Sequence, residues 1–157
     1  MTRLRGGAPR GVRLVASCPH GHWRTTTMIS AIRVDGSTAC MTIDGATDTE
    51  VFQAYVWAVL CPTLRSGDIV VMDNLAPHKN DQTVALITAT GASVRFLPAY
   101  SPDLNPIEMM WSKLKASLRA AEARTHRDLL AAIAQALHQV TAQDAVNWFA
   151  ACGYGFI

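Results

Sequence analysis

A short apolar run, residues 69–72 (IVVM), ends at a carboxylate, Asp73. A bounded run of this length predicts a strand buried on both faces, as in parallel α/β sheets. Ligands of such sheets bind outside the carboxyl ends of the strands. Asp73 is therefore predicted to lie at the edge of the sheet where ligands bind and catalytic residues are found. The alternative is structural, because Asp73-Asn74 can also form an Asx turn that ends the strand.

A second carboxylate, Glu108, follows the proline-rich loop 97–107 at the start of a predicted helix. Thirty-four residues, positions 74 to 107, separate it from Asp73. A predicted helix at 80–90 and a strand at 93–97 return the chain to the same sheet edge. The two acids can then converge on a hard cation such as Mg²⁺, which carboxylates bind. Alternatively, Glu108 completes a capping box with Asn105.

Two segments, VVMDNLAPHK (70–79) and LPAYSPDLNPIEMMWSKLK (97–115), give the chain a family resemblance. It resembles bacterial insertion-sequence transposases related to mariner elements, the insertion sequence 630 group. Those enzymes use an Asp-Asp-Glu triad with 34 residues between the second Asp and the Glu. The resemblance covers nearly the whole chain. It implies DNA transposition by an α/β, ribonuclease H-like mixed sheet with flanking helices, with Asp73 and Glu108 as ligands of two Mg²⁺ (or Mn²⁺) ions.

One departure from the family concerns the first Asp, which lies there on a central strand upstream of a basic Arg-Gly segment. Here Met1 stands two residues before such a segment, residues 3–13. We therefore expect an N-terminally truncated catalytic domain (1–157) that is inactive alone and needs an upstream transposase fragment. The rival is a non-catalytic remnant or regulatory module that binds DNA or a full-length transposase. A resolvase or nuclease of the same fold is a third option.

The resemblance also implies DNA as partner, both transposon ends and target, and a homo-oligomer when the protein is complete. Residues expected beside the metal site or facing DNA are Asn74, His78, Lys79, Tyr100 and Ser112. Expected phosphate contacts are Arg3, Arg5, Arg10, Arg13, Lys113, Lys115 and Arg119. Structural alternatives stay open: His78 can be a surface loop residue, and Tyr100 can serve loop rigidity.

Charge distribution, hydropathy and cysteine spacing indicate the class of protein. Net charge is +2, yet six arginines, the last of them Arg33, precede the first acid, Asp35. They indicate a polyanion contact, or alternatively a solvated basic tail at 1–11 followed by exposed strands. No apolar stretch reaches the roughly 18 residues of a membrane span. The four cysteines show no CxxC pairing, which favours reduced thiols in a cytoplasmic, nucleoid-associated protein.

Local patterns predict the remaining elements. Strands are expected at about 12–18, 24–34 and 38–43, with a hairpin turn at Asp35-Gly36. A capping box at 47–50 opens a helix that Pro62 ends after about residue 60. Three further helices are expected at 106–121, 126–140 and 142–151. The predicted inward side chains of the second are Leu129, Leu130, Ile133, Leu137 and Val140.

Overall fold

The computed structural model describes residues 6–15 and 25–155. Arg3, Arg5, Arg24, Cys18 and positions 16–18 of the first predicted strand lie outside the described residues. No helix in the described ranges is long and apolar enough to cross a membrane. The fold is mixed α/β, with two small sheets and flanking helices, and it agrees with the predicted ribonuclease H-like class.

Strands β1 (Thr26–Ile32) and β2 (Thr38–Asp44) form an antiparallel hairpin, as the sequence predicts. At its turn, Gly36 has a φ of +86°, which a side chain would strain. A Cβ at this position would also lie 2.7 Å from the backbone nitrogen of Ala142. The hairpin turn therefore packs against the start of helix α6 (Ala142–Ala151) and requires glycine for both reasons.

Helix α1 (Thr49–Tyr55) continues as one π-helical turn, η1 (Val56–Leu60), and a 3-10 turn, η2 (Cys61–Thr63). The predicted extent is confirmed, but the predicted capping box at 47–50 is wrong. The cap is Asp48, whose carboxylate accepts a hydrogen bond of 2.9 Å from the Val51 N–H. Asp is a stronger N-cap residue than Thr, so the helix begins one residue later than expected.

The inner side of α1 and η1 packs on one face of the β1–β2 hairpin. Tyr55 is buried, and its hydroxyl donates a 2.9 Å hydrogen bond to the carbonyl of Ala39. Burial raises the pKa of the Tyr55 hydroxyl, which therefore stays neutral. The core cluster at this interface consists of Phe52, Tyr55, Val56, Leu60, Met72, Ile87 and Ala92, with Ile29, Ala31, Met41, Val70 and Val94 packed against it.

A second, parallel pair of strands follows, β3 (Ile69–Met72) with β4 (Ser93–Phe96). Helices α2 (Ala76–Lys79) and α3 (Asp81–Thr88) connect them. The predicted burial of β3 on both faces is wrong. Met72 is buried in the core, but Ile69 on the other face is 62% exposed.

The three C-terminal helices follow their sequence signals closely. Helix α4 (Pro106–Ala121) and α6 have the predicted bounds, and α5 (His126–His138) ends two residues early. Side chains of Thr125 and Thr141 cap α5 and α6 as expected. Leu130, predicted to face inward, is 37% exposed. The second core cluster consists of Met110, Leu114, Leu118, Ile133 and Ala136, with Met28 and Ile32 of β1 packed against it.

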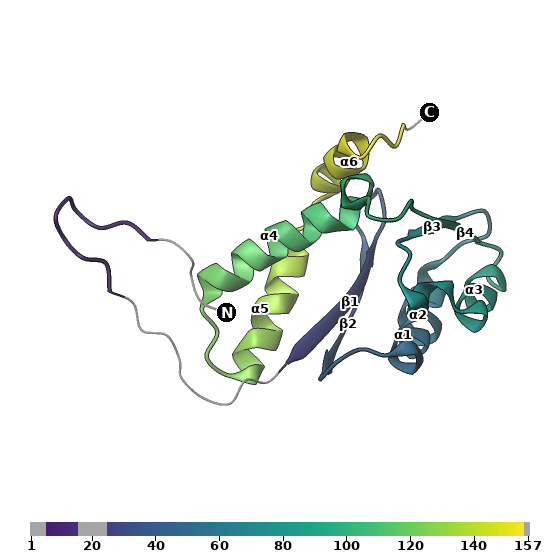
Figure 1. Cartoon of the computed structure of the whole chain (residues 1–157), viewed down its shortest axis with the longest axis horizontal. Helices are drawn as coiled ribbons and strands as arrows, with labels where there is room; N and C mark the ends of the chain where they lie inside the picture. The colour runs from purple at the N-terminus through teal and green to yellow at the C-terminus, as the bar shows by residue number, and fades with distance from the viewer. Residues whose placement is uncertain (1–5, 16–24, 156–157) are drawn as a thin grey trace.

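The β1–β2 hairpin is thus covered on both faces. Helices α4 and α5 lie on one side of it, and α1 to α3 with β3 and β4 lie on the other (Figure 1). Alternation along β1 explains this arrangement, because Ile29 and Ala31 enter the first cluster while Met28 and Ile32 enter the second.

Among the described residues the two strand pairs are separate sheets, and the edges of β1 and β3 that face away from β2 and β4 have no partner strand. The Arg33 N–H donates to the Ser37 carbonyl, so odd-numbered residues of β1 bond to β2. The backbone groups of Met28, Ser30 and Ile32 therefore point to the other edge. By the same reasoning, Ile69 and Val71 direct theirs away from β4, since Ser93 bonds to Asp68. No strand in the described part of the chain pairs with either edge.

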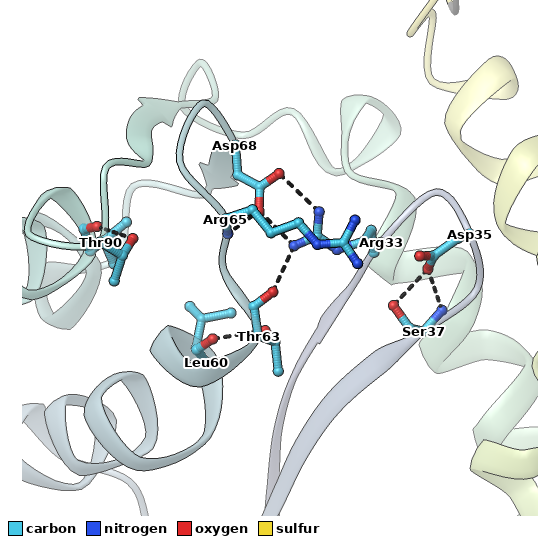
Figure 2. Close-up of polar contacts among 9 residues, drawn as sticks. Arg33, Asp35, Ser37, Leu60, Thr63, Arg65, Asp68 and Thr90 are labelled. Carbon is cyan, nitrogen blue, oxygen red and sulfur yellow. Dashed lines mark hydrogen bonds and ion pairs between the residues drawn. The ribbon is translucent and has the colours of Figure 1, made fainter.

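One ion pair connects the end of β1 to the start of β3 (Figure 2). Arg33 donates to both carboxylate oxygens of Asp68, at 2.9 and 2.6 Å, and to the carbonyl of Thr63. The Arg65 N–H donates to Asp68 as well. These bonds, with Arg33 the largest cause, hold the pKa of Asp68 at about 2. The expectation that Arg33 contacts a polyanion is therefore replaced by a structural role.

The strand predicted at 12–18 is absent from its described part. Residues 12–15 form no strand, and the only hydrogen-bonded turn there joins the Val12 N–H to the Pro9 carbonyl. Side chains of Val12, Leu14 and Val15 are exposed. The β-branched composition predicts a strand only if a partner strand is present, and no described strand lies beside this segment.

We predict that Asp68→Asn lowers the free energy of unfolding by about 1–2 kcal/mol at pH 7. The folded pKa lies below the ordinary value of 3.8, so the stabilisation is complete above pH 4 and is lost as the pH falls towards 2. Urea unfolding at several pH values measures the effect. Asp103→Asn, at an exposed carboxylate without an ion pair among the described residues, is the control. A difference that persists unchanged at pH 2 would refute the ion-pair explanation.

Candidate active site at the junction of the two sheets

Asp73 follows the last residue of β3, at the carboxyl end of the parallel pair. Its Oδ1 accepts a 3.1 Å hydrogen bond from the Leu75 N–H, so the Asx turn considered from the sequence does form. The side chain is nevertheless 45% exposed. The carboxylate is therefore turned towards solvent, and Oδ2 accepts no hydrogen bond from the described residues. The Asx turn and a role as a ligand are therefore compatible for Asp73. Oδ1 orients the side chain, and Oδ2 is available to a ligand.

His78 lies against Asp73 from helix α2. Its Nδ1 is 2.6 Å from Asp73 Oδ1, and its ring packs on Phe52 with 4.4 Å between ring centroids. The contact between Nδ1 and Oδ1 does not have hydrogen-bond geometry. It is an electrostatic contact, which becomes an ion pair when the imidazole is protonated. His78 is thus beside the Asp73 carboxylate, and it is also anchored to the core through Phe52.

Asn74 joins the ends of the two parallel strands. Its Nδ2 donates to the carbonyl of Leu97, the residue after β4, and the Leu97 N–H donates to the Met72 carbonyl at 2.8 Å. The side chain is partly buried and points to protein rather than to solvent. Sequence reasoning did not identify this role. The signal available was an amide side chain directly after a strand, where it can satisfy a backbone group of the neighbouring chain segment.

Glu108 lies in the first turn of α4 and is exposed. Asn105 occupies the N-cap position, but its side chain makes no capping hydrogen bond. The Glu108 carboxylate has no hydrogen-bond or ion-pair partner among the described residues. The capping-box alternative is therefore not realised, which leaves a free carboxylate at the positive end of a sixteen-residue helix.

Asp73 and Glu108 belong to opposite sides of the junction between the sheets. Asp73 extends β3, whereas α4 packs on β1 through Met28 and Ile32. A loop, residues 97–105, which contains the 3-10 turn η3 (Pro102–Leu104), joins the two sides directly. Within it, Tyr100 is fully exposed and has a φ of +58°. Any site built from both acids depends on how the two halves of the molecule are held together.

The predicted cationic contacts divide into engaged and open side chains. Lys113 donates to Asp144 at 2.6 Å and to the Gln139 carbonyl at 2.8 Å, so its ammonium is held inside the chain. This contact and those from Thr141 hold the pKa of Asp144 at about 2. Of the other predicted phosphate contacts, Arg10, Arg13 and Lys115 are exposed and Arg119 is half-buried. Lys79 and Ser112, predicted to lie beside the metal site or to face DNA, are exposed as well.

A metal ion would find a partial set of ligands here. Carboxylate oxygens are the donors that Mg²⁺ prefers, and Asp73 and Glu108 both present them to solvent. The two side chains therefore fit a hard divalent cation. In the described ranges, no three His, Cys, Asp or Glu side chains gather as a metal cluster. The described thiols, Cys40, Cys61 and Cys152, are free, as predicted.

Residues 1–130 match the family described as DDE superfamily endonuclease. The chain belongs to this family. Family membership gives the chain a nuclease- or transposase-type domain, consistent with DNA as a partner and with a divalent metal. No curated protein matches the chain.

We predict stability effects of different size for two residues of the candidate site. Asn74→Ala should lower the free energy of unfolding by about 1–2 kcal/mol, because the Leu97 carbonyl loses its partner. Glu108→Gln should change it by less than about 0.5 kcal/mol, since the carboxylate makes no internal contact. Thermal or urea unfolding of both variants measures this. A large loss of stability in Glu108→Gln would mean that Glu108 has a capping role after all.

Proposed function

We propose that this chain carries part of the active site of a DNA transposase, which cleaves DNA strands and transfers them to a target. Asp73 and Glu108 are the assigned metal ligands. The observation that carries the proposal is the presence of two solvent-facing carboxylates, one directly after β3 and one in the first turn of α4, in a chain of the DDE superfamily endonuclease family.

The bound divalent ions would activate a water or a 3′-hydroxyl and stabilise the leaving oxygen of a phosphodiester. The chain's own residues supply the positions of the ligands. The Leu75 N–H and His78 hold Asp73 Oδ1, which leaves Oδ2 directed outward. Asn74 fixes the start of the loop that leads to Glu108.

The third carboxylate of the proposed site comes from a strand outside the described residues. The free edges of β1 and β3 support this assignment, because no described strand pairs with the outward N–H and C=O groups of either one. An added strand between them would unite the two sheets and end beside Asp73. An upstream-encoded transposase segment is the occupant that the family resemblance implies.

A rival function is favoured by the same edges. A chain with two open strand edges can bind an extended segment of another protein by strand addition, without any catalysis. Such a regulatory module would bind a full-length transposase and block its assembly. The two functions differ in whether Asp73 and Glu108 matter to the outcome, since strand addition needs only backbone groups.

The basic side chains that form no ion pair with other described residues would contact DNA phosphates. Lys115 and Arg119 lie on α4 in the same stripe as Glu108, spaced for one helix face. Arg10 and Arg13 add charge in the exposed N-terminal segment. Such contacts position a duplex without reading its sequence. Lys113 contributes less, because Asp144 already holds its ammonium.

The metal assignment predicts weak binding of Mn²⁺ that depends on both acids. Asp73→Asn and Glu108→Gln should each lower Mn²⁺ affinity by roughly tenfold or more, in line with the loss from disturbing a metal site. Electron paramagnetic resonance of free Mn²⁺ measures binding, with Asp103→Asn as the matched control. Unchanged affinity in both variants would remove Asp73 and Glu108 from the ligand set.

The same variants separate the enzyme from the regulator. With an upstream-encoded segment supplied in trans, Mg²⁺-dependent nicking of plasmid DNA should appear and should be abolished by Asp73→Asn. If the segment binds but no nicking appears, and inhibition of an intact transposase survives in Asp73→Asn, the regulatory function is the correct one.

Binding to duplex DNA should weaken as salt increases, with a slope of log K against log[salt] of about −0.9 for each neutralised phosphate. Replacing Lys115 and Arg119 together by Ala should reduce the slope by about 2. Fluorescence anisotropy in a salt series measures this. Arg127→Ala, at an exposed position on α5, is the control. An unchanged slope in the double variant would place the DNA elsewhere.

A further inference from the structure

Tyr100 combines two features that a packing role does not explain. Its side chain is 102% exposed, so the ring makes no contact that stabilises this chain. Its backbone has a φ of +58°, in the left-handed region that glycine and asparagine occupy most easily. For a bulky residue this conformation is a genuine outlier and costs free energy. An aromatic residue at this position is therefore unfavourable for the isolated fold.

The loop that presents Tyr100 is held at both ends. At its start, the Leu97 carbonyl accepts from Asn74, and the Leu97 N–H donates to Met72. At its end, the Leu104 carbonyl accepts a 3.1 Å hydrogen bond from the Tyr154 hydroxyl. Between these points the Leu104 N–H donates to the Ser101 carbonyl. The ring thus projects from a fixed segment, not from an unsupported loop.

The position of this loop relates Tyr100 to the two carboxylates. The loop begins at the strand end that carries Asp73 and finishes at the N-cap of the helix that carries Glu108. A DNA strand whose phosphodiester reaches both acids passes this connection. Residues 97–102 carry no charged side chain, so the loop offers the strand an aromatic face in place of a phosphate contact.

We propose that Tyr100 stacks on a nucleobase that is unpaired next to the phosphodiester held at Asp73 and Glu108. This inference rests on the proposed function, because it takes DNA as the substrate. Aromatic side chains bind bases through their faces in a way that tolerates any sequence, and single-stranded or splayed bases are the ones that present a free face. The residue acts in substrate binding and takes no part in bond breaking.

The experiment measures the affinity of the full chain for two DNA probes in the absence of metal. One probe is a fully paired duplex, and the other is the same duplex with a short 3′ overhang. Wild-type chain should bind the overhang probe roughly 5- to 100-fold more tightly by fluorescence anisotropy, the range that one stacked base supplies. Tyr100→Phe should keep this preference, because the ring remains.

Tyr100→Asn should lose the preference without loss of stability, since Asn tolerates the left-handed conformation that strains Tyr. Its melting temperature should equal or exceed that of the wild-type chain. Trp57→Ala, which removes another exposed aromatic ring (68% exposed) from a different element, is the matched control and should leave the preference unchanged. Iodouracil in the overhang should cross-link to Tyr100 under ultraviolet light.

Each outcome bears on a defined claim. An overhang preference that survives in Tyr100→Asn overturns the stacking role but leaves the metal assignment of Asp73 and Glu108 intact. Cross-linking to a residue outside the loop 97–105 has the same meaning. Absence of binding to either probe by the wild-type chain overturns the stacking role together with DNA as the substrate. Altered Mn²⁺ binding in Asp73→Asn is measured without DNA, so it tests the proposed function separately.

Discussion

A single apolar core holds together two sheets that share no backbone hydrogen bond within the described part of the chain. β1 and β2 contribute Ile29, Ala31 and Met41 to it, and β3 and β4 contribute Val70, Met72 and Val94. Side chains of α1 and η1, above all the buried Tyr55 and Val56, fill the space between. Because strand pairing does not cross the junction, this core and the Arg33–Asp68 ion pair set the relative position of the two sheets.

The packing between the two sheets also determines the geometry of the candidate site. Asp73 moves with β3, and Glu108 moves with α4, which is fixed to the opposite face of β1 by Met28 and Ile32. The geometry between the carboxylates is therefore a property of the whole junction and not of either sheet. Small changes in packing around Tyr55 would shift one acid against the other, since packed interiors transmit displacement. The direct connection through loop 97–105, fastened by Asn74 and Tyr154, limits that movement.

Sequence signals located the helices and the hairpin well, because these elements contain their own start and stop residues. Thr125 and Thr141 cap their helices as predicted, and the apolar spacing of Met110, Leu114 and Leu118 fixed the inner face of α4. Errors arose where a residue's partner lies far away in the chain. The 12–15 segment has strand composition but no adjacent strand, and Arg33, expected to meet a polyanion, meets Asp68. Composition cannot specify such non-local partners.

The motif residues likewise divide by whether their polar groups are already satisfied. Asn74 and Lys113 direct their donors to carbonyl or carboxylate oxygens of the same chain, and His78 packs on Phe52 beside Asp73. These side chains hold the structure around the site together. Their closeness to Asp73 in the sequence therefore does not show that they bind a metal or DNA. Glu108, Lys115 and the ring of Tyr100 make no hydrogen bond, ion pair or ring contact with other described residues. Side chains that a fold positions on fixed elements and leaves unsatisfied are the ones available to substrate and metal. Here they are Asp73, through Oδ2, after β3, together with side chains of the loop 97–105 and of the helix α4 that follows it.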